Sequence, residues 1–239
     1  MKVFVINLAR STERRQLMTE KMAVAGVEFE FFDAVDAAVP DFSLSERAAP
    51  EITLKLKGYT LLSSEVACYA SHYLMWEKCI ELGESIVVLE DNIDVSGDFK
   101  QVIDALLNKT KSYDYIKLSA TLNGRKFKAL EPICSDTKLG IYNKGTSGAT
   151  GYVITPKAAR AFMDASAKFI FPCDDLMEKP WLHRIQAYSV YPSICWRANI
   201  VSTIGNNRKN KQHLGFINKL SVELFRVYES VMKNISWKY

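Results

Sequence analysis

An acidic cluster at the end of an apolar run is the first place in this chain where chemistry could occur. Residues 86–89 read Ile-Val-Val-Leu without polar alternation, which is typical of a strand buried on both faces of a sheet. Glu90 and Asp91 follow directly, and we expect Asn92 and Asp94 in the loop beyond. In open α/β sheets ligands bind beyond the carboxyl ends of strands, and clustered acids there suit a divalent cation that carries phosphates. The alternative is a solvated strand end.

A helix predicted over residues 61–82 carries a second group of reactive side chains. Ser63 or Ser64 is its expected cap, and Gly83 its expected end. Helical spacing places five of its residues on one face: Glu65, Cys68, His72, Trp76 and Cys79. A face that mixes Glu, His and Trp is not an ordinary core stripe. A ligand site is one interpretation, and a helix beside the sheet with locally satisfied polar groups is the other.

Two later segments are less specific. Residues 145–151 form a loop of small residues, which lets a backbone approach a ligand closely, but their spacing matches neither a Walker loop nor the dinucleotide fingerprint. Asp174 and Asp175 follow Pro172, and two acids behind a proline can simply cap a helix. Taken alone, Asp174 and Asp175 are better explained as residues that cap a helix.

The elements that position these residues alternate along the chain. A strand over residues 2–8, a helix from 11 to 26 and a strand over 27–32 form a βαβ unit, which predicts a parallel sheet. Further elements follow: a helix at 96–108, a strand at 113–119, antiparallel strands within 126–143, a strand at 152–155, a helix at 156–168 and a strand at 186–191. The fold class is therefore α/β.

Composition narrows the class of protein. The chain has 239 residues, of which 48% are hydrophobic and 24% charged, and this excludes wholesale disorder. Its five scattered cysteines argue against a disulfide framework or a zinc site. No apolar run approaches the roughly 18–20 residues that span a bilayer, and the N-terminus lacks a signal-peptide core. We therefore expect a cytoplasmic protein.

The C-terminal segment is basic and amphipathic. Residues 206–239 hold seven Lys or Arg against two Glu, whereas the rest of the chain is near neutral. One predicted helical face collects the apolar residues Ile217, Leu220, Leu224, Val227, Val231 and Ile235. We expect a main domain over residues 1–212 and this helix over 213–239. The helix could dock on its own domain or lie on an anionic membrane surface.

Several ordered blocks resemble glycosyltransferase family 25, which contains lipopolysaccharide and lipooligosaccharide sugar transferases such as bacterial β-1,4-galactosyltransferases. Residues 5–15 with 32–36 resemble its N-terminal signature, residues 65–76 its second block, and residues 89–93 its acidic motif. Residues 151–159 and 172–177 also fit. The resemblance covers roughly residues 3–210, and ordered blocks are more specific than one motif.

The resemblance implies a GT-A type fold, with a Rossmann-like, mixed and mostly parallel central sheet. It implies an inverting transferase that moves a hexose, galactose from UDP-galactose, to a glycolipid oligosaccharide, and no nucleic-acid partner. Asp174 or Asp175 would then take the proton of the acceptor hydroxyl. The implied donor-binding residues are Asn7, Leu8, Ser11, Arg14, Asp33, Asp36, Glu65, His72, Glu90, Asp91 and Arg208. The implied ligands of Mn²⁺ or Mg²⁺ are Asp91, Asn92 and Asp94. The basic helix would hold the enzyme at the inner membrane leaflet.

One departure from the family pattern concerns the metal. The family usually has Glu-Asp-Asp where this chain has Glu90, Asp91 and Asn92. A carboxamide keeps an oxygen but removes a charge, which puts the metal in doubt. A nucleotide-sugar-binding homologue with impaired catalysis is therefore the alternative. A dinucleotide-dependent enzyme is disfavoured, because no glycine fingerprint follows the first strand, and a glycoside hydrolase stays open.

Overall fold

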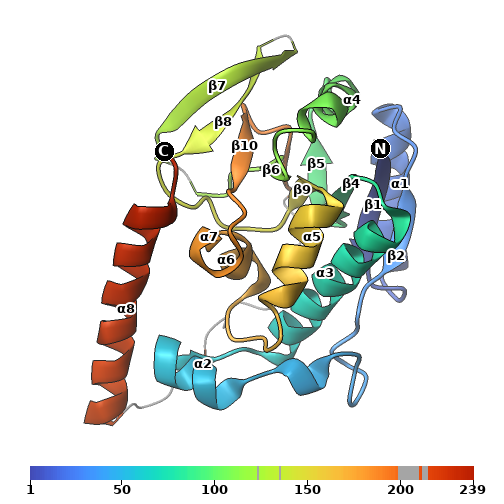
Figure 1. The fold of residues 1–239 in the computed structure, drawn as a ribbon. Coiled ribbons are helices and arrows are strands. Elements are labelled where there is room, and N and C mark those ends of the chain that lie inside the picture. The colour runs from blue at the N-terminus through green and yellow to red at the C-terminus, as the bar shows by residue number, and fades with distance from the viewer. Residues whose placement is uncertain (123, 135, 199–209, 212–214) are drawn as a thin grey trace.

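One eight-stranded sheet forms the centre of the computed structural model (Figure 1). The structure describes residues 1–122, 124–134, 136–198, 210–211 and 215–239. Across the sheet the order is β2 (Glu30–Asp33), β1 (Lys2–Asn7), β4 (Ile86–Glu90), β9 (Gly151–Ile154), β6 (Tyr115–Lys117), β10 (Tyr188–Tyr191), β8 (Thr137–Tyr142) and β7 (Phe127–Cys134).

The directions of the strands make the sheet mixed. β1 pairs in parallel with β2 and β4, and β6 pairs in parallel with β10. β9 and β8 run antiparallel to their neighbours and so oppose the other six strands. The predicted mixed, mostly parallel sheet is confirmed in this sense. The antiparallel strands expected within residues 126–143 are β7 and β8.

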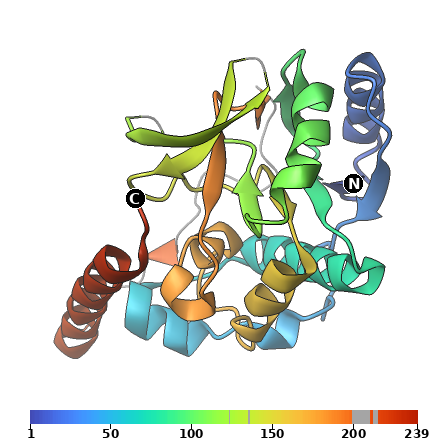
Figure 2. The ribbon, with the colours of Figure 1, turned by 45° about the horizontal axis from the view of Figure 1, so that its top comes forward.

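Helices cover both faces of the sheet (Figure 1 and Figure 2). α3 (Ser63–Leu82) and α5 (Pro156–Asp164) pack on one face, while α1 (Thr12–Val24) and α4 (Phe99–Lys109) pack on the other. Successive residues of β4 alternate between the two cores. Burial on both faces leaves this strand without a solvent-facing position, which explains its unbroken apolar sequence.

Shorter elements complete the chain. The helical ones are η1 (Ser45–Arg47), α2 (Pro50–Lys57), α6 (Cys173–Met177), α7 (Pro180–His183) and the longer α8 (Phe216–Ser236). The paired strands are β5 (Ile93–Val95) with β11 (Cys195–Arg197) and β3 (Tyr59–Thr60) with β12 (Asn210–Lys211). Within the described ranges, every helix is too short or too polar to cross a bilayer.

Two local predictions are wrong. Ser63 and Ser64 do not cap α3, because both lie inside it, and the Glu65 carboxylate instead accepts the Leu62 N–H at 2.9 Å. Asp94 does not lie in a loop, because it belongs to β5, which begins directly after Asn92 and pairs with the distant β11. Pairing with a strand far along the sequence leaves no local signal.

α8 docks through the face opposite to its apolar stripe. Val222 is buried, and Phe225 packs against the core beneath α3 and α5. Glu229 accepts a hydrogen bond from Lys57 at 3.0 Å and also pairs with Lys179. The stripe faces outwards, with exposed fractions of 50–74% at Leu220, Leu224, Val227, Val231 and Ile235. The helix is docked, but its apolar stripe is not what docks it.

Candidate functional site

A pocket of about 290 Å³ lies at the carboxyl ends of three neighbouring strands. Leu8 follows β1, Asp36 follows β2, and Glu90 ends β4. Cys68 and His72 of α3 form the facing wall. This is the edge of the sheet at which the sequence predicted a ligand.

Asp91 is the most enclosed carboxylate of the pocket, with 9% of its surface exposed. Its Oδ2 accepts a hydrogen bond from Asn7 Nδ2 at 2.7 Å, and its Oδ1 accepts one from the Arg14 guanidinium at 3.0 Å. Asn7 is held in turn by Arg15, whose Nε donates to Asn7 Oδ1 at 3.1 Å. Asp91 therefore fixes Arg14 at the pocket wall.

Two polar atoms of the pocket are buried without a hydrogen-bond partner among the described residues. They are an acceptor, Oδ1 of Asn92, and a donor, Nε of Arg197. Leaving such an atom unpaired costs about 1–3 kcal/mol, which favours a ligand that pairs with it. Sequence reasoning missed Arg197, since no local pattern marks it and only the pairing of β11 with β5 brings it here.

Each of the three arginines that line the pocket contacts a carboxylate. The pairs are Arg10 with Asp36 (2.5 Å), Arg14 with Asp91 (3.0 Å) and Arg197 with Glu90 (3.6 Å). The hydrogen bond from Arg10 lowers the pKa of Asp36. Among the described residues these charges balance, so a diphosphate bound here needs further positive charge.

The predicted donor-binding residues divide into two groups. Leu8, Arg14, Asp36, His72, Glu90 and Asp91 line the pocket, and Asn7 supports it. The others do not line it: Asp33 is largely exposed and pairs with Arg15, Ser11 precedes α1, and Glu65 caps α3. Arg208 lies outside the described residues.

The three predicted metal ligands are not gathered at one point. Asp94 does not line the pocket and pairs with Lys21 at 2.6 Å. Asp91 and Asn92 both line it, and the buried Asn92 Oδ1 is available. A carboxylate with an amide oxygen suits a magnesium or manganese ion that phosphates also bind. Asp91 and Asn92 therefore fit such an ion, and Asp94 does not.

Cys68, His72 and Glu90 form a closer group, with one ligand atom from each lying within 4.8 Å of the others. Burial, followed by the charges of Glu90 and Asp174, raises the pKa of the Cys68 thiol. A cysteine binds metal as its thiolate, so an ion bound by this group would have to displace the thiol proton.

His72 is a buried imidazole at the pocket wall. Its Nδ1 lies 2.9 Å from the Tyr152 hydroxyl, whose oxygen accepts a hydrogen bond from Trp76 Nε1 at 3.2 Å. These contacts fix the orientation of the His72 ring. Burial lowers the pKa of His72 to about 4, although the charge of Asp174 opposes this.

We expect acid to destabilise the protein through His72 and His183. Burial lowers the pKa of each to about 4, whereas the unfolded value is about 6.5. The unfolded chain binds more protons between these values, so stability is full above pH 6.5 and falls by about 3 kcal/mol per histidine towards pH 4. Urea unfolding between pH 7.5 and 4.5 measures this loss, and His183→Gln should remove about half of it. An unchanged pH dependence in that variant would contradict the assignment.

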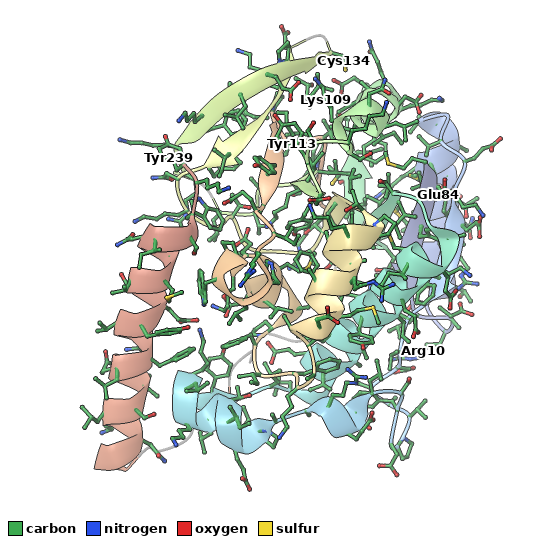
Figure 3. The ribbon with its side chains drawn as sticks, viewed as in Figure 1. Arg10, Glu84, Lys109, Tyr113, Cys134 and Tyr239 are labelled. Atoms are coloured by element: carbon green, nitrogen blue, oxygen red, sulfur yellow. The ribbon has the colours of Figure 1, made fainter. Side chains whose placement is uncertain are left out.

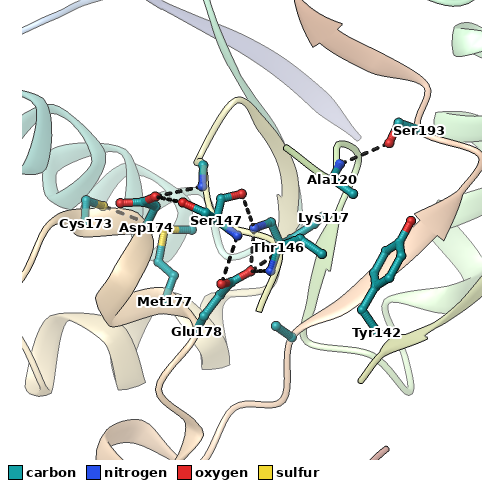
Figure 4. Close-up of polar contacts among 12 residues, drawn as sticks. Lys117, Ala120, Tyr142, Thr146, Ser147, Cys173, Asp174, Met177, Glu178 and Ser193 are labelled. Atoms are coloured by element: carbon teal, nitrogen blue, oxygen red, sulfur yellow. Dashed lines mark hydrogen bonds and ion pairs between the residues drawn. The ribbon is translucent and has the colours of Figure 1, made fainter. Parts of the chain in front are cut away.

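The loop of small residues binds two carboxylates of the protein itself (Figure 4). Glu178 accepts the N–H groups of Thr146 and Ser147 at 2.9 and 3.1 Å, and Lys117 Nζ lies 2.6 Å from Glu178 Oε1. A Cβ added at Gly145 would lie 2.3 Å from Glu178 Oε2. Successive backbone N–H groups form such anion-binding concavities. The small residues thus admit an internal carboxylate.

The same loop separates the roles of the two adjacent acids. Asp174 Oδ2 accepts hydrogen bonds from Gly148 N–H at 2.7 Å and the Ser147 hydroxyl at 2.8 Å (Figure 4). Burial raises the pKa of Asp174, but these bonds and the charge of Lys117 outweigh it and keep the pKa below its ordinary value. Thr150, two residues beyond Gly148, accepts the N–H of the pocket residue Glu90 at 3.0 Å. The loop therefore joins Asp174 to the edge of the pocket.

Asp175 points elsewhere. Its carboxylate lies 3.0 Å from Lys179 Nζ and 3.4 Å from Lys57 Nζ, and it lines a different cavity beside α8. Both acids occupy the first turn of α6, but neither caps it: the N-cap residue is Pro172, and α6 has no side-chain cap hydrogen bond.

Comparison with known proteins agrees with the resemblance. The family model described as "Glycosyltransferase family 25 (LPS biosynthesis protein)" matches residues 1–177. The chain is 26% identical to the lipooligosaccharide biosynthesis protein lic2B of Haemophilus influenzae, covering 80% of this chain and 74% of that protein. It is 24% identical to the lacto-N-neotetraose biosynthesis glycosyltransferase LgtE of Neisseria meningitidis serogroup B, covering 82% and 73%.

A third relative carries a different description. The chain is 31% identical to "Inactive glycosyltransferase 25 family member 3" of Mus musculus, covering 44% of this chain and 19% of that protein. That relative covers less than half of this chain, whereas the family model spans well over half of the 239 residues. This chain belongs to glycosyltransferase family 25.

Proposed function

We propose that this chain transfers galactose from UDP-galactose, with inversion, to a hydroxyl of a lipooligosaccharide or lipopolysaccharide acceptor. The observation that carries the proposal is the pair of unpartnered atoms, Asn92 Oδ1 and Arg197 Nε, in the pocket at the carboxyl edge of the sheet. The bacterial relatives named for lipooligosaccharide and lacto-N-neotetraose biosynthesis support the choice of acceptor.

The proposed reaction is a single displacement. Asp174 accepts the proton of the acceptor hydroxyl while the new bond from its oxygen to the anomeric carbon forms. The bond from that carbon to the phosphate oxygen breaks, and UDP leaves with the electron pair. Arg14, held by Asp91, and Arg197 contribute fixed positive charge. A divalent cation held by Asp91 and Asn92 would supply the further charge that the balanced pocket lacks.

The test is a calorimetric screen of nucleotide sugars followed by a transfer assay. UDP-galactose should bind to the protein, and it should be consumed only when an oligosaccharide acceptor is present. NMR of the product should show the inverted linkage. Asp91→Asn should weaken binding in the presence of Mn²⁺, because it removes the carboxylate proposed to hold the cation and to fix the position of Arg14. Absence of binding by every UDP-sugar would end the proposal.

A second candidate is a nucleotide-sugar-binding homologue with impaired catalysis. Asn92 in the acidic motif favours it, and one relative is named as inactive. UDP-galactose binding without transfer to any acceptor in a panel would select this candidate.

We expect Asn92→Asp to tighten binding of the Mn²⁺ ion that supports transfer. A second carboxylate beside Asp91 adds one negative charge near the ion, which should lower the half-saturating Mn²⁺ concentration about tenfold or more. The measurement is transfer rate against Mn²⁺ after EDTA treatment. Asp94→Asn is the matched control and should change nothing, since Asp94 pairs with Lys21. Equal responses in both variants would exclude Asn92 as the ion's ligand.

α8 supports a further part of the proposal, peripheral binding to the anionic inner leaflet. Its exposed stripe contains Leu224 and Val227, each 63% exposed, and it belongs to the basic segment of residues 206–239. Leu224→Asp or Val227→Asp should reduce binding to anionic liposomes at least tenfold. The matched control is Val24→Asp on α1, where the valine is 92% exposed.

Point variants are preferable to truncation of α8. Removing the helix would also remove Glu229, the partner of the buried Lys179 and of Lys57. Liposome binding that survives both aspartate substitutions, or that Val24→Asp weakens equally, would rule out the stripe as the contact.

A further inference from the structure

A second and larger cavity lies between α8 and the segment that contains α6 and α7. Its volume is about 610 Å³, within the range of roughly 300–1,000 Å³ that small-molecule sites occupy. Asp175, Trp181, Lys233 and Trp237 are among its lining residues, and it shares none of the described lining residues with the first pocket. Figure 3 shows Tyr239 of this cavity and Arg10 of the first pocket on opposite sides of the molecule.

The acids of the cavity are already neutralised. Asp175 and Glu229 share the ammonium groups of Lys57 and Lys179. Glu178 forms its own ion pair with Lys117, which is buried. Among the described residues, the side-chain carboxylates that line the cavity are therefore matched by lysines within hydrogen-bonding reach.

Lys233 is left over as a partly buried cation. It lines the cavity, lies 5.4 Å from the ring centroid of Trp237, and forms no ion pair within the described part of the chain. Burial lowers the pKa of Lys233, although the charge of Glu178 opposes this. An anion bound beside Lys233 would pair an ammonium group that burial has partly removed from water.

Aromatic rings supply the rest of the lining. Trp237 is fixed, because its Nε1 donates to the Tyr142 carbonyl oxygen at 2.7 Å. Trp181 of α7 also lines the cavity, and its ring centroid lies 5.1 Å from Lys179 Nζ. Rigid aromatic faces beside polar groups accommodate amphipathic ligands such as sugar rings, which have apolar faces and polar edges.

We propose that this cavity binds an anionic saccharide unit, a sugar that carries a carboxylate or a phosphate, with the charged group beside Lys233 and the ring against Trp181 and Trp237. Asp175 lines the cavity, and Asp174 beside it is the proposed base. The bound sugar is thus a part of the acceptor distant from the reacting hydroxyl, and this link to the acceptor rests on the proposed function.

Calorimetry on the full chain tests the proposal with four probes: galacturonate, galactose 6-phosphate, galactose and inorganic phosphate. The first two should bind at least tenfold more tightly than galactose, and the tighter of them identifies the charged group. Galactose 6-phosphate should also bind at least tenfold more tightly than inorganic phosphate. Equal affinity for phosphate, or for uncharged galactose, would overturn the proposal.

Variants assign the binding to this cavity. Lys233→Gln should weaken binding of the charged sugars about tenfold, and Trp181→Leu should weaken it without changing the preference for charge. Lys219→Gln, an exposed lysine on the same helix outside the cavity, is the matched control. Asp91→Asn should not alter this binding. Unchanged affinity in Lys233→Gln would overturn the site. Loss of UDP-sugar binding alone would instead refute the proposed function.

Discussion

Replacing Asp174 by Asn should lower kcat for transfer about 10²- to 10⁴-fold, because the variant has no carboxylate to take the acceptor proton. The amide oxygen of Asn can still accept the hydrogen bonds from Gly148 N–H and the Ser147 hydroxyl, so the fold should persist. Steady-state kinetics with UDP-galactose and a soluble acceptor oligosaccharide measure the effect. KM for the donor should change little, since Asp174 does not line the first pocket.

Asp175→Asn is the matched control at the neighbouring position. Its carboxylate faces Lys57 and Lys179 in the second cavity, so kcat should remain within a few-fold of the unaltered protein. A larger fall in kcat for Asp175→Asn than for Asp174→Asn would reverse the assignment of the base. Full turnover in both variants would remove this acid pair from the mechanism.

Replacing Glu178 by Gln should destabilise the protein by about 3–5 kcal/mol. The substitution leaves the Lys117 ammonium, on a side chain only 2% exposed, without its counter-ion. It also replaces one of the two acceptor oxygens with an NH₂ group, so only one of the loop N–H groups of Thr146 and Ser147 keeps its acceptor. Urea unfolding at pH 7 measures the change. Because the same loop holds Asp174, activity should fall as well.

Glu223→Gln provides the control for an exposed ion pair. Glu223 pairs with Arg226 on the outer surface of α8, where both side chains are more than 60% exposed, so its loss should cost less than about 1 kcal/mol. A similarly small loss for Glu178→Gln would show that water reaches the Lys117 pair and that the loop does not depend on it.

The sequence alone determined the features that depend on local patterns. The apolar residues of β4 followed by Glu90 and Asp91 predicted a buried strand with acids at its carboxyl end, since burial on both faces permits no polar residue within it. Helical spacing placed Cys68 and His72 on one face of α3, and both line the pocket. The ordered blocks identified the family.

Only the tertiary structure decided which distant residues meet. Arg197 reaches the pocket because β11 pairs with β5, and Glu178 occupies the small-residue loop because α6 packs against it. The outward apolar stripe of α8 follows from the pairing of Glu229 with Lys57 and Lys179, which overrides the usual burial of such a stripe. Ion pairs and strand pairings between residues far apart in the chain leave no periodicity in the sequence. They can therefore be identified only from the tertiary structure.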